Sequence, residues 1–267
     1  MKGRVLIIAG SDSGGGAGIQ ADIKAITALG GYAMTAITAL TAQNTQGVQD
    51  IHEVPPTFVK EQITSVLSDI GADSIKIGML HNAEVIGAVH DAIADYAINV
   101  PLVVDPVMVS TSGASLLEER AVNALMQKII PMADVLTPNI PEATALSGME
   151  VDGEEDTGRL AQMLASLGPK SILLKGGHLQ GAVVRDLLIH EEDTVDVFES
   201  PRIETAHTHG TGCTLASALA CGLAQGMSLR DSVVRARRYV HEAIRTAPGY
   251  GKGNGPLNHG HAIPEFS

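Results

Sequence analysis

The stretch that decides the fold is H-T-H-G-T-G-C-T-L-A-S-A-L-A-C-G-L-A-Q, from His207 to Gln225. Small and polar residues open it and an uncharged run of Ala, Leu and Cys follows, which predicts a glycine-rich turn leading into a fully buried helix. Gly210 and Gly212 leave the backbone free to bend and let another group approach closely. The first N–H groups of such a helix have no partner within it, and the helix dipole is positive there. The turn is therefore suited to binding an anion without a cationic side chain.

Cys213 lies at the start of this expected helix. The field that would hold an anion there also favours the thiolate form of a cysteine. A nucleophile or base beside an anion-binding turn is typical of chemistry at a phosphoryl or acyl group. The alternative, from this stretch alone, is a buried helix start capped by Thr211, with Cys213 as a packing residue.

The chain has 267 residues, a formal net charge of -12 and only 3% aromatic residues. The length predicts one large α/β domain over residues 1–267 rather than two small ones. An acidic chain with no basic run is poorly suited to nucleic acid, so local donors must hold any anionic ligand. The first apolar run is too short for a signal peptide, and no stretch approaches the roughly 20 apolar residues of a membrane span. We therefore expect a cytoplasmic protein.

The two cysteines, Cys213 and Cys221, are expected on one helix. Eight residues of helix separate them by roughly 12 Å along the axis. A disulfide needs Cα atoms within about 7 Å of one another, so both thiols should be free. Free thiols are typical of a cytoplasmic protein.

Strands and helices alternate throughout the chain, which predicts a mostly parallel sheet with helices on both faces. The strands expected in this sheet cover residues 5–9, 32–41, 74–79, 102–108 and 171–177, with another beginning at residue 135. A short strand over 48–54 is expected outside the main sheet, whereas 184–190 and 194–198 should form a hairpin on its edge.

Amphipathic or proline-started segments predict helices between these strands. They run from residue 19 to Gly30, from Pro56 to about residue 70, from beyond residue 79 to about 98, and from residue 229 to about 246. The last helix carries Arg235, Arg237 and Arg238, most of which are expected on a solvated face. The glycine-rich tail, 249–261, shows no helical pattern.

The first expected strand runs into the glycine-rich segment 10–18. Residues 16–21 read G-A-G-I-Q-A and formally match the dinucleotide-binding pattern G-x-G-x-x-A. We reject that interpretation because the loop before these glycines is several residues too long and because no acidic residue occurs between Asp22 and Asp50. The phosphate-loop pattern G-x-x-x-x-G-K-[ST] is also absent from the sequence. Segment 10–18 either covers a small substrate or is an ordinary surface loop.

Polar residues follow several of the expected strands, at the edge where open α/β sheets bind ligands. Gln43 can donate and accept in one plane, as the edge of a heteroaromatic ring requires. Asp105 suits a metal or hydroxyl partner, and Lys175, beside two glycines, indicates a phosphate contact. The structural alternatives are an amide that caps a strand end for Gln43 and a loop-capping carboxylate for Asp105.

Asn139 and Glu142 lie three residues apart at the start of an expected helix and could share one face of it. Their oxygens are hard ligands of the kind that Mg²⁺ or its waters prefer. The same spacing is that of a capping box, with Asn139 as the N-cap and Glu142 at the third helical position. The two roles are not exclusive.

These pieces come in the order and spacing of one known family. The motifs are I-A-G-S-D-S-G-G-G-A-G-I-Q-A-D-I-K, T-A-L-T-A-Q-N-T, K-I-G-M-L, D-P-V-M, T-P-N-I-P-E-A, K-G-G-H, H-T-H-G-T-G-C-T and the tail G-K-G-N-G-P-L-N-H. The chain resembles, over nearly its whole length, the hydroxymethylpyrimidine/phosphomethylpyrimidine kinases of thiamine biosynthesis, within the ribokinase-like superfamily.

The resemblance implies a ribokinase-like three-layer α/β/α sandwich. It also implies that ATP phosphorylates 4-amino-5-hydroxymethyl-2-methylpyrimidine to the monophosphate and then to the diphosphate. ATP and Mg²⁺ are the implied cofactors, and a homodimer is usual in the family. The nearest alternative is a pyridoxine or pyridoxal kinase of the same fold. A non-catalytic pyrimidine-binding sensor is another, although such a sensor would be expected to lose Cys213, Lys175 or the glycines.

The resemblance also assigns roles to individual residues. The implied anion hole and its base are Gly210, Thr211, Gly212 and Cys213, with Lys175 as a phosphate contact; Cys213 stands where sugar kinases carry an aspartate. The implied pyrimidine contacts are Gln43, Asp22, Gly10, Met79 and Val107. The implied nucleotide contacts are Asn139, Glu142, Lys175 and Gly177. The implied metal ligands are Asp105 and Glu142.

Overall fold

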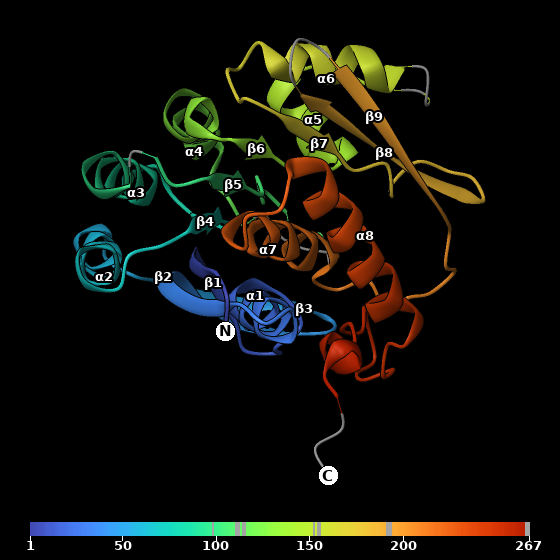
Figure 1. Ribbon diagram of the computed structural model, residues 1–267, viewed down its shortest axis with the longest axis horizontal. Coiled ribbons are helices and arrows are strands. Elements are labelled where there is room, and N and C mark those ends of the chain that lie inside the picture. The colour runs from blue at the N-terminus through green and yellow to red at the C-terminus, as the bar shows by residue number, and fades with distance from the viewer. Residues whose placement is uncertain are drawn as a thin grey trace.

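A sheet of nine strands, in the order β3-β2-β1-β4-β5-β6-β7-β8-β9, runs through the protein (Figure 1). The structure is a computed structural model that describes residues 1–97, 99–109, 113, 116–151, 153, 156–190 and 194–264. The strands are β1 (Arg4–Asp12), β2 (Tyr32–Asn44), β3 (Gly47–Glu53), β4 (Ser74–Ile77), β5 (Leu102–Val104), β6 (Val135–Leu136), β7 (Ile172–Leu174), β8 (Val183–His190) and β9 (Thr194–Pro201).

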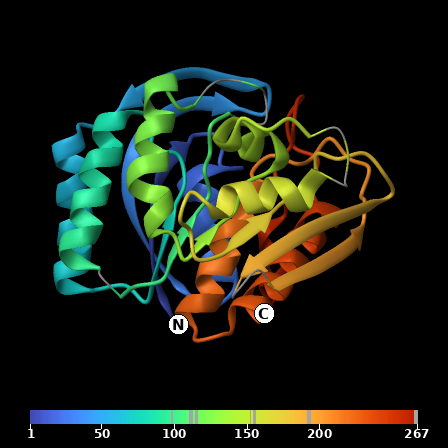
Figure 2. The ribbon, with the colours of Figure 1, turned by 90° about the horizontal axis from the view of Figure 1, so that it is seen from above.

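Helices cover both faces of this sheet. They are α1 (Gly18–Ala28), α2 (Pro56–Asp69), α3 (Ala83–Tyr96), α4 (Glu119–Ala124), α5 (Ile140–Ser147), α6 (Thr157–Ala165), α7 (Thr211–Ala224) and α8 (Leu229–Arg245). In Figure 2, α2, α3 and α4 stand side by side along one part of the sheet. The predicted helix end near residue 98 lies outside the described residues, and α3 ends at Tyr96.

The two faces of the sheet build two cores because successive side chains of a strand point to opposite sides. In β1, Leu6 and Ile8 pack with the core under α2 to α6, whereas Val5 and Ile7 pack with the core under α1, α7 and α8. The same alternation continues through the central strands. Strands covered on both faces read as unbroken apolar runs, which is why the sequence predicts them well.

Local signals fix where several helices begin. Pro56 opens α2, and Asn82 caps α3 by accepting a hydrogen bond from the backbone N–H of Val85. Asn139 and Glu142 form the predicted capping box at the start of α5, so that interpretation is confirmed. None of the helices among the described residues is long and apolar enough to cross a membrane.

The order of strands corrects one expectation. The strand predicted outside the main sheet is β3, which pairs antiparallel with β2 and forms one edge of the sheet. Only Thr45 and Gln46 separate the two strands, and so short a connection returns the chain directly alongside β2. The hairpin predicted at the other edge is confirmed as β8 and β9.

Helix α7 is buried along most of its length, as predicted, with every residue from Thr214 to Gly222 inside the protein. Gly210 precedes it with a φ of 83°, a conformation that favours glycine. Thr211 is the first helical residue, and no side chain caps the helix start. The alternative in which Thr211 caps this helix is therefore wrong.

Two of the three arginines of α8 that were expected mostly on a solvated face, Arg235 and Arg237, are not solvated. Arg237 Nε donates to Asp186 Oδ2 at 2.7 Å, and that guanidinium is only 12% exposed. Arg235 reaches back to the end of α7 and donates to Gln225 Oε1 at 2.6 Å. Of these three arginines, only Arg238 is exposed as expected, because β8, β9 and α7 pack against this side of α8.

The glycine-rich tail also differs from expectation, because it ends in a 3₁₀ turn over His259–Ala262.

We expect a pair of glycine-to-alanine variants to test the packing of α7. A Cβ at Gly222 would lie 2.5 Å from Ser232 Oγ of α8, whereas a Cβ at Gly87 of α3 would meet only Lys128 Nζ, at 3.5 Å. Gly222→Ala should lower the free energy of unfolding by about 1–3 kcal/mol through overpacking. Gly87→Ala should raise it by about 0.5–1 kcal/mol, since alanine favours the helix. Urea unfolding followed by circular dichroism measures the free energy of unfolding of both variants. Equal changes in the two variants would contradict the tight contact between α7 and α8.

Candidate active site

A cavity of about 750 Å³ lies along the carboxyl ends of the parallel strands, where open α/β sheets bind ligands. Its volume is within the roughly 300–1,000 Å³ range of small-molecule sites. The structure brings all but one of the predicted site residues to its walls. They are Gly10, Gln43, Met79, Asp105, Val107, Asn139, Glu142, Lys175, Gly177, Gly210, Thr211, Gly212 and Cys213.

Asp22 is the exception. Its side chain is 0% exposed and does not line the cavity. Instead it holds Lys76, whose Nζ lies 3.0 and 2.9 Å from its two carboxylate oxygens. Lys76 lines the cavity and Asp22 does not, so the contact between Asp22 and the pyrimidine stays a prediction.

The turn that begins α7 packs directly on the glycine-rich loop that follows β1. A Cβ at Gly210 would collide with the backbone oxygen of Gly16, so only glycine allows this approach. His209 Nε2 lies 2.9 Å from Asp12 Oδ2 and joins the same two segments. The segment 10–18 is therefore part of the cavity wall and not an ordinary surface loop.

Asp12 organises that loop from within. Its carboxylate accepts hydrogen bonds from the backbone N–H groups of Gly14, Gly16 and Ala17, at 2.8, 3.0 and 2.8 Å. Burial alone would raise the pKa of Asp12, but the bonds from His209 and the backbone outweigh burial and lower it. Sequence reasoning missed Asp12. An aspartate whose side chain can bond the backbone N–H two residues on, at the start of a glycine-rich turn, could have indicated this role.

Cys213 lines the cavity at the start of α7, and the backbone N–H of Gly18 in α1 lowers the pKa of its thiol. Burial raises the pKa of the Cys213 thiol to about 12, and the positive charge of Lys76 lowers it only in part. The expectation that the helix start favours the thiolate is therefore wrong for this structure. Desolvation of the sulfur outweighs the helix dipole.

Lys175 connects the two predicted carboxylates. Its Nζ lies 2.8 Å from Asp105 Oδ1 and 3.8 Å from Glu142 Oε2. Burial raises the pKa of Glu142 to about 7 even though Lys175 lowers it. A Cβ at Gly212 would lie 3.2 Å from Lys175 Nζ and 3.4 Å from Asp105 Oδ2, so this charged group stands against the anion-binding turn.

The two carboxylates fit a hard divalent cation. Asp105 and Glu142 offer oxygen ligands, which Mg²⁺ prefers over nitrogen and sulfur. Both are held in place, since Thr137 Oγ1 donates to Asp105 Oδ1 at 3.2 Å and Glu142 accepts from the backbone N–H of Asn139 at 2.8 Å. The capping bond uses one Glu142 oxygen only, so capping and metal binding remain compatible.

Gln43 stands at the end of β2 with part of its amide already engaged. Its Oε1 accepts from Thr41 Oγ1 at 3.1 Å, and its Nε2 lies 3.5 Å from His209 Nε2. A carbonyl oxygen and an amide nitrogen each have capacity for a second hydrogen bond. Met79 and Val107 pack nearby in an apolar cluster, which suits the faces of a flat ring beside that polar edge.

Part of the cavity lining was not predicted from the sequence. Apolar side chains of Ile203, Val240 and Ile244 make up this part, with Arg202 and His241 as polar neighbours. These positions come from the segment after β9 and from α8, and no local pattern marks them.

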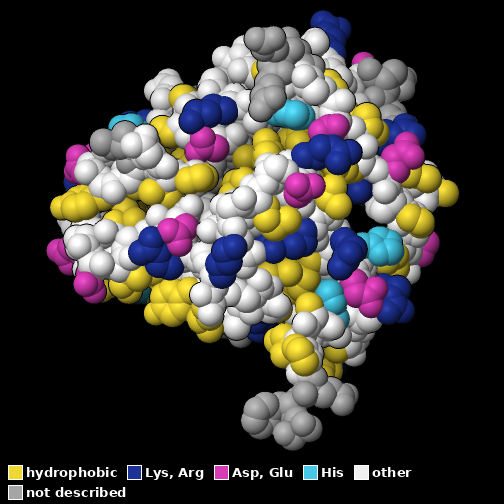
Figure 3. Space-filling view, in the orientation of Figure 1, with side chains coloured by type: hydrophobic (Ala, Val, Ile, Leu, Met, Phe, Trp, Pro, Cys, Tyr) yellow, Lys and Arg dark blue, Asp and Glu magenta, His cyan; other side chains and the backbone are white. Residues whose placement is uncertain are grey.

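On the face that Figure 3 displays, basic and acidic side chains are interspersed and the described residues form no continuous basic surface.

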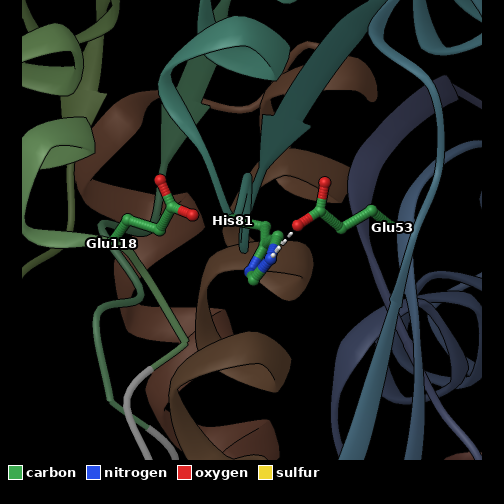
Figure 4. Close-up of side chains that lie close together, drawn as sticks. All are labelled: Glu53, His81 and Glu118. Atoms are coloured by element: carbon green, nitrogen blue, oxygen red, sulfur yellow. Dashed lines mark hydrogen bonds and ion pairs between the residues drawn. The ribbon is translucent and has the colours of Figure 1, made fainter.

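A second polar group lies outside the cavity, between β3 and the segment after β4. Ligand atoms of Glu53, His81 and Glu118 lie within 4.8 Å of one another, and Figure 4 shows His81 between the two glutamates. His81 Nε2 lies 3.2 Å from Glu53, and Arg120 Nε lies 2.8 Å from Glu118. Since both carboxylates already have partners, we interpret this group as a link between segments and assign no metal to it.

Comparisons with known proteins agree with this geometry. A family model described as phosphomethylpyrimidine kinase matches residues 12–258. The chain is 50% identical to the thiamine biosynthesis bifunctional protein ThiED of Geobacter sulfurreducens over 97% of its own length, but it spans only 52% of that relative. It is 47% identical to the hydroxymethylpyrimidine/phosphomethylpyrimidine kinase of Streptomyces coelicolor, over 98% of this chain and 96% of that one.

Solved structures support the same assignment and confirm the ribokinase-like α/β fold. The phosphomethylpyrimidine kinase of Clostridium difficile 630 is 41% identical with a TM-score of 0.80, covering 91% of this chain and 100% of that one. A pyridoxal kinase of Bacillus subtilis, solved with ADP, is 31% identical with a TM-score of 0.88, covering 97% and 98%. With the match over residues 12–258 and these full-length relatives, the chain belongs to the phosphomethylpyrimidine kinase family.

Proposed function

We propose that this protein uses ATP to phosphorylate 4-amino-5-hydroxymethyl-2-methylpyrimidine to its monophosphate and then to the diphosphate, in thiamine biosynthesis. One observation carries the proposal. Gln43, whose amide can hydrogen-bond to the edge of a heteroaromatic ring, lines the same cavity as the anion-binding turn and Cys213. Lys175 and its two carboxylate partners line it as well, in a chain of this family. The homodimer and the cytoplasmic location expected from the sequence stay predictions.

Phosphoryl transfer needs mainly alignment and neutralisation of charge. The backbone N–H groups of Gly210 and Gly212 stabilise the transferring phosphoryl group, because they are preorganised at the start of α7, whereas the N–H of Thr211 donates to Thr208 O at 3.3 Å. Lys175 adds a fixed positive charge beside that turn. Asp105 and Glu142 would hold Mg²⁺, which would supply charge neutralisation to the phosphates of ATP.

Cys213 accepts the proton of the substrate. The hydroxymethyl oxygen forms the new P–O bond, the bond to ADP breaks, and the proton of the hydroxyl passes to the Cys213 thiolate. Because burial raises the pKa of this thiol to about 12, the thiolate is a minor species near neutral pH. The rate of the chemical step should therefore follow the thiolate fraction.

ADP release measured in parallel with the pyrimidine, its monophosphate and pyridoxal tests the proposed function. We expect turnover with the first two and much less with pyridoxal. The pyridoxal comparison is needed because solved pyridoxal kinases share the fold at 31 to 33% identity. Turnover with pyridoxal alone would favour the pyridoxal kinase alternative, and binding of the pyrimidine without any ADP release would favour the sensor.

We expect Gln43→Ala to raise the KM for the pyrimidine by about tenfold or more, because two hydrogen bonds to the ring edge are lost. The KM for ATP should change little. Gln46→Ala is the matched control, since Gln46 is exposed on the β2–β3 turn and does not line the cavity. Steady-state kinetics with each substrate varied measures both; equal behaviour of the two variants would remove Gln43 from pyrimidine recognition.

We expect Glu142→Gln to raise the Mg²⁺ concentration needed for half-maximal activity by about tenfold or more, because a charged ligand is replaced by a neutral one. Glutamine still accepts the capping bond from the backbone N–H of Asn139, so α5 should keep its start. Mg²⁺ titrations of ADP release at saturating substrates provide the measurement. An unchanged half-maximal concentration would mean that Glu142 serves the capping box alone.

We expect Cys213→Ala to lower the single-turnover rate by about 10²- to 10⁴-fold, the usual contribution of a general base. The affinity for ATP should stay within about twofold. Cys221→Ala is the control, because Cys221 lies on the same helix but is buried away from the cavity.

The pH dependence separates a base from a packing residue. Only the thiolate accepts a proton, so the wild-type single-turnover rate should rise about tenfold per pH unit at pH values below the thiol pKa. In Cys213→Asp the rate should be nearly flat above about pH 6, since a carboxylate is ionised there. Parallel profiles for the two proteins between pH 6.5 and pH 9 would count against proton transfer to Cys213.

A further inference from the structure

A buried ion pair stands at the wall of the cavity and has no part in the steps above. Lys76 of β4 and Asp22 of α1 are both 0% exposed, with their charged atoms 2.9 Å apart at the nearest. Ser217 Oγ of α7 donates to the same carboxylate at 2.7 Å. Removing two charges from water costs several kcal/mol per ion, and well-packed apolar residues often stabilise a core as well. This pair is therefore weak evidence for stability and invites a functional explanation.

The positive end of the ion pair lines the same cavity as the sulfur of Cys213. Ser217 follows Cys213 by four residues on α7, so both side chains lie on the same face of the helix. Lys76 lines the cavity together with Cys213, whereas Asp22 does not. The positive end of the pair therefore faces the cavity and the negative end faces the protein interior. Gly78 makes room for this arrangement, because a Cβ there would lie 2.8 Å from Lys76 Nζ.

Charged groups reach the surroundings of the sulfur from several elements. They are Asp22 from α1, Lys76 from β4, Asp105 after β5 and Lys175 after β7. Lys76 lowers the pKa of the Cys213 thiol, whereas Asp22 and Asp105 raise it. Burial lowers the pKa of Lys76, but the negative charges of Asp22, Cys213 and Asp105 and the hydrogen bond to Asp22 together raise it by more, so the ammonium keeps its charge.

We propose that Lys76 is a positioning residue for the reaction: its ammonium, anchored by Asp22, stabilises the thiolate of Cys213 as that sulfur takes the proton of the substrate. The inference rests on the proposed role of Cys213. One proton passes from the hydroxyl oxygen to the sulfur, and Lys76 stays protonated throughout. The backbone N–H of Gly18 supports the same thiolate from the start of α1.

The test measures the thiol itself rather than turnover. All proteins carry Cys221→Ser, so that Cys213 is the single cysteine, and mass spectrometry follows its alkylation by iodoacetamide between pH 6 and pH 10. The main variant is Lys76→Met with Asp22→Asn, which removes both charges in near-isosteric form and keeps an acceptor for Ser217. Lys76→Met alone is the second variant, because burial raises the pKa of Asp22 and an unpaired Asp22 should take up a proton.

In each variant that keeps a cooperative thermal transition, we expect the rate of Cys213 alkylation at a given pH to fall by about tenfold or more. A tenfold fall corresponds to a rise of about one unit in the pKa of the thiol. The acid limb of the single-turnover rate should move to higher pH by the same amount, with the KM for ATP unchanged. Ser217→Ala is the control; it keeps both charges and should change alkylation less than about threefold.

Superimposed alkylation profiles for the parent and a folded charge-removing variant would overturn the inference. Its failure is distinguishable from failure of the proposed base, because thiol reactivity is read without substrates. Normal phosphorylation by the Cys213→Ala variant would show that Cys213 is not the general base, whatever the alkylation profiles show.

Discussion

The close contact between the start of α7 and the loop after β1 is the constraint on which the rest of the site depends. Gly210 approaches the backbone of Gly16 too closely for any side chain, and the His209–Asp12 pair holds the two segments at 2.9 Å. Asp12 in turn shapes its loop through three backbone N–H groups. This contact places the turn that begins α7 beside the loop after β1, in the wall of the cavity that Gln43 also lines.

Charge is distributed around that contact in two buried groups. Lys175 bridges Asp105 and Glu142, and Lys76, which lines the same cavity as Cys213, pairs with Asp22. Each group pairs its charges internally, which limits the cost of burial. The acidic chain can thus receive anionic substrates through local donors, although its formal net charge is -12. The proposed chemistry follows from this arrangement, because transfer needs fixed positive groups and one proton acceptor.

Much of the fold was predictable because parallel strands covered on both faces read as apolar runs between glycine and proline signals. Gln43, Asp105 and Lys175 were found for the same reason, since the ends of neighbouring parallel strands meet at one edge. The edge strand β3 was misplaced because its exposed, polar pattern does not reveal its partner. The capping box at Asn139 could be read directly, since it depends on residues three apart.

The rest of the site depends on contacts that a linear pattern does not encode. Asp12 and His209 are 197 residues apart, and Asp22 and Lys76 are 54 apart. An isolated lysine inside an apolar strand is a signal that a buried carboxylate must exist, but it does not say which one. The thiol pKa was misjudged because the helix dipole is visible in the sequence, whereas desolvation of the sulfur depends on the packed structure.

The central claim is that one cavity holds the pyrimidine hydroxyl between the Cys213 sulfur and a phosphoryl group seated on the first turn of α7. A crystal structure of the protein with the pyrimidine, Mg²⁺ and a non-hydrolysable ATP analogue tests it most directly. We predict the hydroxymethyl oxygen within hydrogen-bonding distance of that sulfur, and the terminal phosphoryl group against the backbone N–H groups of Gly210 and Gly212. A ring bound away from Gln43, with its hydroxyl pointing away from Cys213, would contradict the account.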